Sequence, residues 1–269
     1  TPVVIALARF LKEKGWRPGI VSRGYGGKIK HFPYQVHQNS NAREVGDEPL
    51  LIVRHTDCPT VIDPNRSRGV RALLKRAHCN LVISDDGLQH SSLGRNIEII
   101  VVDGERRFGN NFCLPAGPLR EPTSRLNSVD FVISKENPLR HEFKLSLIPD
   151  HFYQLIQPKI KKTLDYFHGK TLHAVAGIGN PDQFFNSLRK LNLKIIEHPF
   201  PDHYLFKPHD FSYGSDAIII MTEKDAVKLW QYHPDALAVP LRAAIDEGFF
   251  IAFDALLARA RARSLSSPS

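Results

Sequence analysis

Two pairs of acidic residues in this sequence could carry metal binding and proton transfer. Asp85 and Asp86 directly follow the apolar run NLVIS, and Asp47 and Glu48 precede the apolar segment LLIV. Carboxylates at the end of a buried strand can hold a magnesium ion or its water shell, as a Walker-B aspartate does. In the second pair, Asp47 could act as a base while Glu48 helps to order the metal. The sequence therefore offers candidates for both parts of a metal-assisted reaction.

Each acidic pair also has a purely structural interpretation. Residues 85–87 form an Asp-Asp-Gly sequence that is typical of a turn, and Asp47 and Glu48 could be the favourable acidic residues of a helix N-terminus. His90 follows Asp86 by four residues, which is a possible spacing for a transition-metal pair. Hard oxygen donors with few other ligands favour magnesium over zinc. Both interpretations of each pair stay open at this point.

A glycine-rich turn lies at residues 22–28, with the sequence SRGYGGK. Its three glycines would let backbone amides approach an anion closely, and Arg23 and Lys28 add positive charge. The turn matches neither GxGxxG nor a Walker A motif. It is either an anion-binding loop or one of the many glycine-rich turns without a ligand.

The second half of the chain adds two further candidates. His203 lies in the sequence PDHY and could shuttle a proton if it stands beside a catalytic carboxylate, although a loop histidine is commonly a surface residue. Residues 222–225, with the sequence TEKD, follow the apolar run AIIIM. By themselves they predict a helix N-cap with an acidic first turn.

Alternating strands and helices must position these residues. A helix is predicted over residues 3–14 and another over 66–78, and strands are predicted at residues 19–21, PTVI, NLVIS, IEIIVVD and FVISK. This order favours a doubly wound parallel α/β sheet with its ligand site at the carboxyl ends of the strands. Residues 104–125 are rich in Gly, Pro and Arg and form a functional loop rather than a connector.

A second, smaller α/β lobe is predicted after a weakly patterned link at residues 137–168. Its elements are the strands LHAVAG, LKIIEH, AIIIM and ALAVP and the helices DQFFNSLRKL and EKDAVKLW. We therefore expect a core over residues 1–150 and a smaller lobe over residues 151–269 that closes over the active site. The C-terminal tail with Arg259, Arg261 and Arg263 is expected to be a frayed, basic and solvated end.

Composition limits the partners and the compartment. The 269 residues are 42% hydrophobic and can bury a sizeable core, and the formal net charge of +8 would attract nucleic acid, anionic lipid or a phosphorylated substrate. Cys58, Cys79 and Cys113 form no CxxC pair, which argues against a disulfide framework or zinc cluster and favours the cytoplasm. No run approaches the roughly 18 apolar residues of a membrane span, and no signal-peptide pattern opens the chain.

In this order the motifs resemble those of the tetraacyldisaccharide 4'-kinases. The resemblance covers residues 1 to about 230 and rests on SRGYGG, VGDEP, DDGLQH, VVDGERRFGN, LPAGPLREP, AGIGNP, the DH of PDHY, and MTEKDAVK. It implies a P-loop NTPase-like fold. A P-loop ending Gly-Lys-Thr-Pro opens the first helix in that family, so Thr1 and Pro2 resemble its last two residues.

The resemblance also implies a role for individual residues. Asp47 matches the proposed catalytic base of the family, and His203 matches the histidine that pairs with this base. Thr1 matches the P-loop hydroxyl that ligates magnesium. The other implied residues support the metal (Glu48, Asp85 and Asp86) or the nucleotide (Thr1, Asp85, Asp86, Gln89, His90 and Arg66).

The implied reaction is transfer of the γ-phosphoryl group of ATP, with Mg²⁺, to the 4'-hydroxyl of tetraacyldisaccharide 1-phosphate in lipid A biosynthesis. The implied partners are this lipid A precursor and an anionic membrane surface, and not nucleic acid. The implied location is the cytoplasmic face of the bacterial inner membrane, reached peripherally or through an N-terminal segment that precedes Thr1. Since the P-loop glycines and lysine also precede Thr1 in the family, this chain alone is expected to be inactive.

Two alternatives remain on the sequence. Another P-loop ATPase or ligase could use the same carboxylates with a different acceptor, and a non-catalytic module could dock on anionic lipid through its basic surface. Arg106, Arg107, Arg120 and Arg125 in the long loop could bind an anionic head group or the nucleotide, or could simply be solvated.

Overall fold

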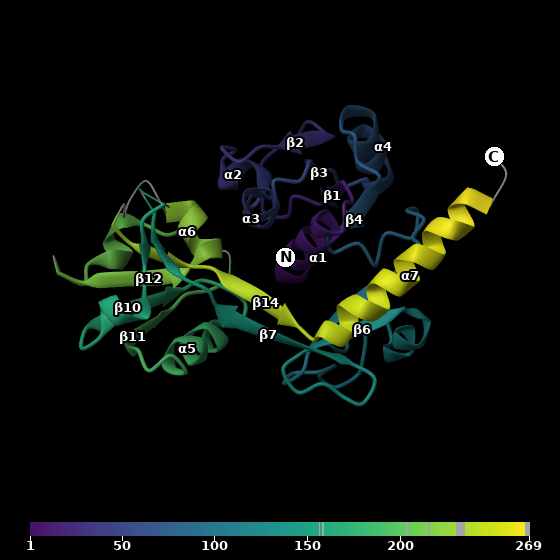
Figure 1. Cartoon of the computed structure of the whole chain (residues 1–269). Coiled ribbons are helices and arrows are strands. Elements are labelled where there is room, and N and C mark those ends of the chain that lie inside the picture. Colours follow the sequence, from purple (N-terminus) through teal and green to yellow (C-terminus); the bar gives the residue numbers. More distant parts are fainter. Residues whose placement is uncertain (156, 158, 203, 215, 230–234, 267–269) are drawn as a thin grey trace. The chain divides into compact units, whose positions relative to one another are not determined.

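The computed structural model describes residues 1–155, 157, 159–202, 204–214, 216–229 and 235–266 (Figure 1). These residues form α-helices and three sheets that contain parallel strands, as predicted. The chain divides into two compact units, of which the first is Thr1–His90 with Ile148–Arg242 and the second is Ser91–Leu147 with Ala243–Ser269. Within the first unit we call residues 1–90 the N-terminal region and residues 148–242 the central region. The division into a core over 1–150 and a lobe over 151–269 stays a prediction.

The sheet of the N-terminal region has the strand order β2-β3-β1-β4. Strand β1 (Pro18–Ser22) is buried along its whole length, as expected for a central parallel strand, and pairs in parallel with β3 (Thr60–Ile62) and β4 (Leu81–Ser84). Strand β2 (Tyr34–Val36) adds an antiparallel edge to β3. Since Ser22 aligns with Ile62 and Val21 with Ser84, the three parallel strands end together.

Four helices accompany this sheet: α1 (Pro2–Glu13), α2 (Ala42–Val45), α3 (Asp47–Thr56) and α4 (Arg66–Arg76). Helix α1 starts with a proline at its first position and buries a stripe at helical spacing that includes Val4 and Ala8. This stripe packs with Ile20 of β1 and Ile52 of α3 in one core. Helix α4 ends two residues before the predicted boundary, because Ala77 is extended.

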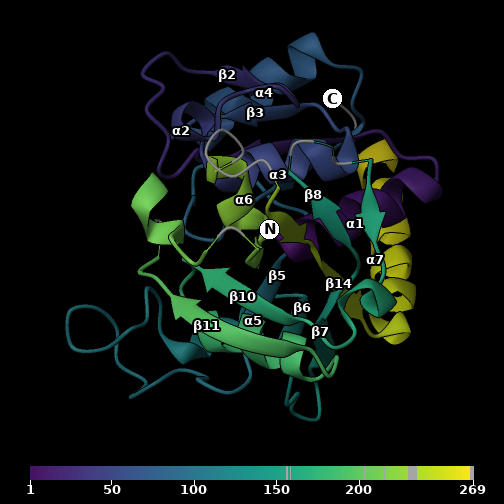
Figure 2. The ribbon, with the colours of Figure 1, turned by 90° about the vertical axis from the view of Figure 1, so that its left-hand side faces the viewer.

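The central region has a six-stranded sheet in the order β11-β10-β12-β13-β8-β9. Strands β11 (Lys194–Pro199), β10 (Thr171–Ala176), β12 (Ile218–Thr222) and β13 (Leu237–Val239) are parallel, and Figure 2 shows β10 and β11 side by side. Strands β8 (Phe152–Gln154) and β9 (Lys161–Lys162) extend the sheet with antiparallel pairing. The short 3₁₀ helices of this region are Leu164–Phe167 and Pro208–Phe211.

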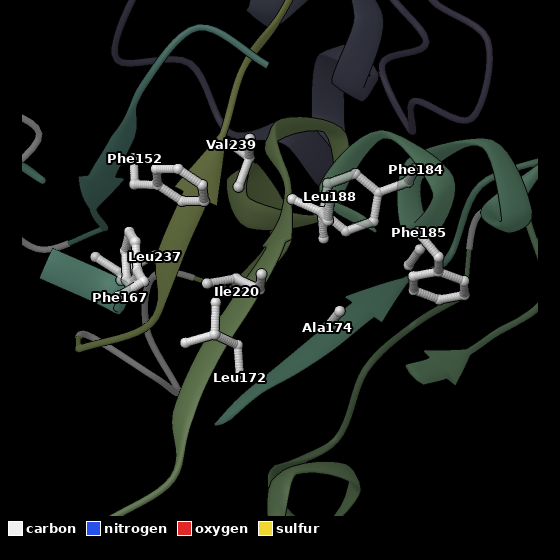
Figure 3. Packing of buried hydrophobic residues seen from close by; sticks show 11 residues of the cluster. Phe152, Phe167, Leu172, Ala174, Phe184, Phe185, Leu188, Ile220, Leu237 and Val239 are labelled. Atoms are coloured by element: carbon white, nitrogen blue, oxygen red, sulfur yellow. The ribbon is translucent and has the colours of Figure 1, made fainter. Parts of the chain in front are cut away.

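Both faces of the central sheet are apolar. Leu172 and Ala174 of β10 pack with Phe184 and Leu188 of α5 (Pro181–Arg189), which lie over this face in Figure 3. Val175, one residue further along β10, belongs to a different cluster with residues of α6 (Glu223–Leu229). Because strand side chains alternate, α5 and α6 cover opposite faces of the sheet.

The second unit contains the sheet β14-β7-β6-β5. Its strands are β14 (Leu241–Ile245), β7 (Phe143–Pro149), β6 (Phe131–Lys135) and β5 (Ile99–Asp103), and it also contains the 3₁₀ helix Thr123–Ser128 and helix α7 (Glu247–Ser266). The rings of Phe131 and Phe143 lie 5.4 and 5.6 Å from that of Phe249 on α7. Aromatic packing therefore fixes α7 within this unit.

Two parts of the chain differ from the predictions. The weakly patterned link at 137–168 contains β7 and the short strands β8 and β9, and the short strands gave little periodicity. The basic tail is not a frayed end, because residues 259, 261 and 263 lie on α7. The helix is held by Phe249, Phe253 and Leu257, which are buried and four residues apart.

Cys58, Cys79 and Cys113 are free thiols in the structure. Across the part of the chain that the structure describes, no helix combines the length and apolar character needed to cross a bilayer.

Candidate active site

The first part of the site lies where β1, β3 and β4 end. The backbone N–H of Asp85 donates to the carbonyl of Val21, and the N–H of Asp63 donates to that of Ser22, at 2.9 and 3.0 Å. The Ser22 hydroxyl lies 3.3 Å from Asp85 Oδ2, which is a weak contact for a buried carboxylate. Burial raises the pKa of Asp85, and the nearby charge of Glu48 raises it further. Glu48 and Asp85 therefore share one electrostatic environment.

Arg66 fills the space beside these strand ends. It is the largest fully buried side chain of the described residues, and it donates to the carbonyl of Asp63 at 2.7 Å and to that of Asp85 at 3.3 Å. Its Nε is buried without a hydrogen-bond partner among the described residues. Burial lowers the pKa of Arg66, and the charges of Asp85 and Asp86 partly offset this effect. The site thus holds a buried cation with unused donor capacity.

Thr1 stands at the N-cap of α1, beside Asp85. Its backbone nitrogen lies 3.8 Å from Asp85 Oδ1, and its carbonyl accepts from the N–H of Ile5. The Thr1 hydroxyl makes no capping hydrogen bond, and its Oγ1 is buried without a partner in the described part of the chain. A buried hydroxyl without a partner is costly, so this oxygen fits a ligand such as a cation.

Asp47 and Glu48 open helix α3, and a close backbone approach places them. Gly46, which precedes Asp47, has a φ of 91°, and a Cβ at this position would lie 2.7 Å from the carbonyl oxygen of Tyr25. The predicted glycine-rich turn therefore packs on the entry to α3, which gives its glycines a structural use. Asp47 is buried, and its Oδ1 accepts from the N–H of Glu48 at 2.9 Å.

Helix α6 of the central region brings two lysines to these carboxylates. Lys228 Nζ lies 3.5 Å from Asp47 Oδ2, and Lys224 Nζ lies 3.5 Å from Glu48 Oε1. Burial lowers the pKa of Lys224, but Asp47, Glu48 and Asp202 outweigh burial and raise it overall. Val227 on the same helix packs in the core of the N-terminal region.

The lysines were missed from the sequence, where residues 222–225 predicted only a helix cap. Asp225 is completely buried, and its carboxylate accepts from the N–H of Gly177 at 2.8 Å and from the Thr222 hydroxyl at 2.7 Å. Its other oxygen lies 3.3 Å from Lys228 Nζ. The i,i+3 spacing of Asp225 and Lys228 on a helix was a usable signal for this pair.

A second group of contacts ties α6 to α3 away from Asp47. Glu223 Oε2 lies 2.5 Å from His55 Nε2, and Glu223 Oε1 accepts from the Tyr153 hydroxyl at 2.7 Å. Burial, followed by the charge of Glu223, raises the pKa of Tyr153. These contacts join the two helices through side chains that are not among the candidate site residues.

The remaining predicted residues follow β4 or lie in the central region. Asp86 is exposed and has a left-handed φ of 47°, which aspartate tolerates in turns. Gln89 is exposed, and the N–H of His90 donates to the carbonyl of Gly87. His203 lies outside the described residues. The structure therefore brings Thr1, Arg66 and Asp85 together at the strand ends. The charge of Glu48 acts on Asp85, and Asp47 is the residue next to Glu48.

The donors fit a magnesium ion that is bound together with a nucleotide. Among the described residues no three His, Cys, Asp or Glu side chains are arranged to hold a metal by themselves. Mg²⁺ usually takes one or two carboxylates and completes its shell with phosphate oxygens and water. The unpartnered Thr1 oxygen beside Asp85 matches this requirement.

The four arginines of the long loop have different surroundings. Arg107 forms a two-point ion pair with Glu142, at 2.7 and 2.8 Å, and Arg125 donates to Glu98 at 2.7 Å. These two side chains organise the second unit. Arg106 and Arg120 are exposed.

Several known proteins are similar to this chain in sequence. A sequence model of one protein family, tetraacyldisaccharide-1-P 4'-kinase, matches residues 1–258. The tetraacyldisaccharide 4'-kinase of Legionella pneumophila (strain Lens) is 48% identical over 255 residues, which are 94% of this chain and 78% of the relative. That of Nitrosococcus oceani is 47% identical over 268 residues, which are 99% and 79%.

A solved structure is also similar. It is the crystal structure of the "apo" form of LpxK from Aquifex aeolicus in complex with ATP, with a TM-score of 0.79 and 26% identity. The match covers 96% of this chain and 83% of that chain. The predicted fold class, α/β with parallel sheets and a P-loop kinase-like architecture, is confirmed by this likeness.

Proposed function

Because the chain belongs to the tetraacyldisaccharide-1-P 4'-kinase family, we propose that the residues gathered around Asp47 and Asp85 carry the kinase reaction of that family. The family activity is that of an ATP-dependent kinase of lipid A biosynthesis, so the predicted enzyme class and the use of ATP are confirmed. The substrate class is the lipid A precursor, a tetraacyldisaccharide. The following steps assign roles to residues of this chain.

Asp47 is the base that accepts the proton of the sugar hydroxyl. Its carboxylate is buried, it begins a helix where a negative charge is favoured, and Lys228 Nζ lies 3.5 Å from its Oδ2. A general base must be deprotonated and within hydrogen-bond reach of the hydroxyl that it serves. We assign His203 as the partner of Asp47. Its sequence neighbour Asp202 lies 3.5 Å from Lys224, which also contacts Glu48, and this supports the assignment.

Thr1, Glu48, Asp85 and Asp86 hold the metal, directly or through water. Magnesium supplies positive charge that neutralises the phosphates during transfer. The buried, unpartnered hydroxyl of Thr1 and the poorly satisfied carboxylate of Asp85 support their place in this set. Arg66, Gln89 and His90 bind the nucleotide. The unused Nε of Arg66 supports a contact with an anion.

We further propose that the protein works at an anionic membrane surface, on the cytoplasmic face of the bacterial inner membrane. The net charge of +8 supports attraction to anionic lipid, and the acyl chains of the substrate require a lipid phase. Arg106 and Arg120 are exposed in the long loop and are the candidates for contact with anionic head groups.

The observation that carries the proposal is the buried carboxylate of Asp85 next to the unpartnered hydroxyl of Thr1. The test measures ATP consumption by the full-length protein in mixed micelles, with and without tetraacyldisaccharide 1-phosphate. We expect turnover that depends on both the lipid and Mg²⁺, and that Asp47→Asn strongly lowers it. Turnover without lipid would indicate an ATPase, and no turnover would indicate a docking module; either result would overturn the proposal.

A further inference from the structure

Helix α6 is fixed to both regions of the first unit by adjacent residues. Ala226 packs in the core beneath the central sheet, and Val227 packs in the core of the N-terminal region. Asp225 and Lys228 lie on the same short helix. The helix thus has little freedom to shift relative to Asp47, which begins α3.

The carboxylate of Asp225 is held by donors from three places. These are the N–H of Gly177, which follows β10, the hydroxyl of Thr222 at the end of β12, and the ammonium of Lys228. Full burial makes each of these contacts valuable, because a buried carboxylate without partners would be strongly unfavourable. Asp225 is therefore an immobile anchor for one side of Lys228.

The other side of Lys228 contacts Asp47. Its Nζ lies 3.3 Å from Asp225 Oδ1 and 3.5 Å from Asp47 Oδ2, and its side chain is 12% exposed. An ammonium group has three donors, so it can serve both carboxylates at once. The Glu48 N–H restrains the other oxygen of Asp47.

We propose that Lys228, anchored by Asp225, is a positioning residue that orients the Asp47 carboxylate. This inference rests on the proposed function, because it assumes that Asp47 is the base. Other charged groups that face Asp47 include Glu48 on its own helix, Lys224 on α6, and Asp202, which pairs with Lys224. Lys228 differs from Lys224 because its second carboxylate partner is buried rather than exposed.

The test compares Lys228→Met and Lys228→Gln with the wild-type full-length protein in a kinase assay. Without the ammonium group the Asp47 carboxylate loses the contact that orients it. We therefore expect kcat to fall on the order of tenfold to a hundredfold while the KM for ATP changes little, as for the loss of an interaction made in the transition state. Lys228→Arg keeps a charged donor for both carboxylates and should keep most of kcat.

Glu223→Gln is the matched control, because it removes a different contact between α6 and α3. It should lower the melting temperature without lowering kcat. Lys228→Gln retains a donor for Asp225 and serves as the neutral variant if Lys228→Met does not fold. An unchanged kcat in the neutral variant, or an equal loss of kcat in Glu223→Gln, would overturn the inference. If Asp47→Asn is fully active, the assignment of the base fails instead.

Discussion

Each region of the first unit has a buried aspartate shortly after a strand. Asp85 directly follows strand β4 in the N-terminal region, and Asp225 is the third residue of α6, the helix that follows strand β12 in the central region. The carboxylate of Asp225 accepts from an amide, a hydroxyl and an ammonium group. That of Asp85 has long contacts with the Ser22 hydroxyl and the Thr1 nitrogen and lies near an unpartnered hydroxyl of Thr1. A buried aspartate after a strand is thus well satisfied in one region and poorly satisfied in the other.

This difference distinguishes residues that stabilise the fold from residues that are placed to bind a ligand. Buried polar groups are normally hydrogen-bonded, so an exception calls for an explanation such as a ligand site. The unpartnered buried atoms of Thr1, Arg66 and Ser84 all belong to the N-terminal region. If the comparison is correct, substitutions of the poorly satisfied residues should mainly change the rate of the reaction, whereas substitution of Asp225 should mainly change the stability of the fold.

The largest effect is expected for Asp47→Asn in the full-length protein. Loss of a general base typically lowers kcat by about 10²-fold to 10⁴-fold, and the KM for ATP should change little. A double-mutant cycle with His203→Ala tests whether the two residues act as one unit, because the losses should then be strongly non-additive. Additive losses, or a silent His203→Ala, would leave Asp47 as a lone base.

Asp225→Asn should act chiefly on folding. Removing one partner of a buried ion pair leaves the other uncompensated, and the cost should be about 3 kcal/mol. Calorimetry on the 269-residue chain would detect this as a lower melting temperature. Asp202→Asn removes a partner of Lys224 in an exposed pair and is the control, with an expected cost below about 1 kcal/mol. Equal losses in both variants would break the distinction between buried and exposed pairs.

Asp85→Asn should have opposite effects on rate and on stability. A lost charge at the metal site should reduce turnover on the order of a hundredfold. Because burial raises the pKa of Asp85, its ionised form destabilises the folded chain, and the neutral amide should raise the melting temperature. A variant that loses activity and also melts at a lower temperature would place Asp85 with Asp225 among the stabilising residues.

The sequence predicted the strands and helices with strong periodicity, and it predicted the acidic residues at their ends. Helix α1 and strands β1, β4 and β10 carry continuous or periodic apolar residues, so local pattern was sufficient. Strands β8 and β9 have three and two residues, which is too short for any period to appear. Contacts such as Lys228 with Asp47 join positions far apart in the chain, and no local rule predicts them.

For the candidate site, too, local sequence pattern was a limited guide. Asp85 and Asp47 could be found because each follows or precedes an apolar run, whereas the glycine-rich turn had two interpretations that the sequence could not separate. Packing requires one of its glycines, since a Cβ at Gly27 would lie 2.4 Å from the carbonyl oxygen of Glu44. Glycine marks a close approach in either case, and only the fold shows whether the approaching group is an anion or the backbone.

The smallest expected effect is a pH dependence of the melting temperature that Asp85 causes. It tests the contrast between Asp85 and Asp225 further. A carboxyl whose pKa is raised in the folded state contributes stability below its unfolded pKa, and this contribution is lost as pH rises through the folded pKa. Asp85→Asn lacks this titration. The melting temperature of the variant minus that of the wild type should therefore grow with pH, and each unit of pKa shift corresponds to about 1.4 kcal/mol. Calorimetry of both 269-residue chains between about pH 4.5 and 8 measures this difference directly, because titrations common to both proteins cancel. A difference that shrinks as pH rises would mean that the folded protein stabilises the charge of Asp85, as it does that of a satisfied carboxylate, and the contrast with Asp225 would fail.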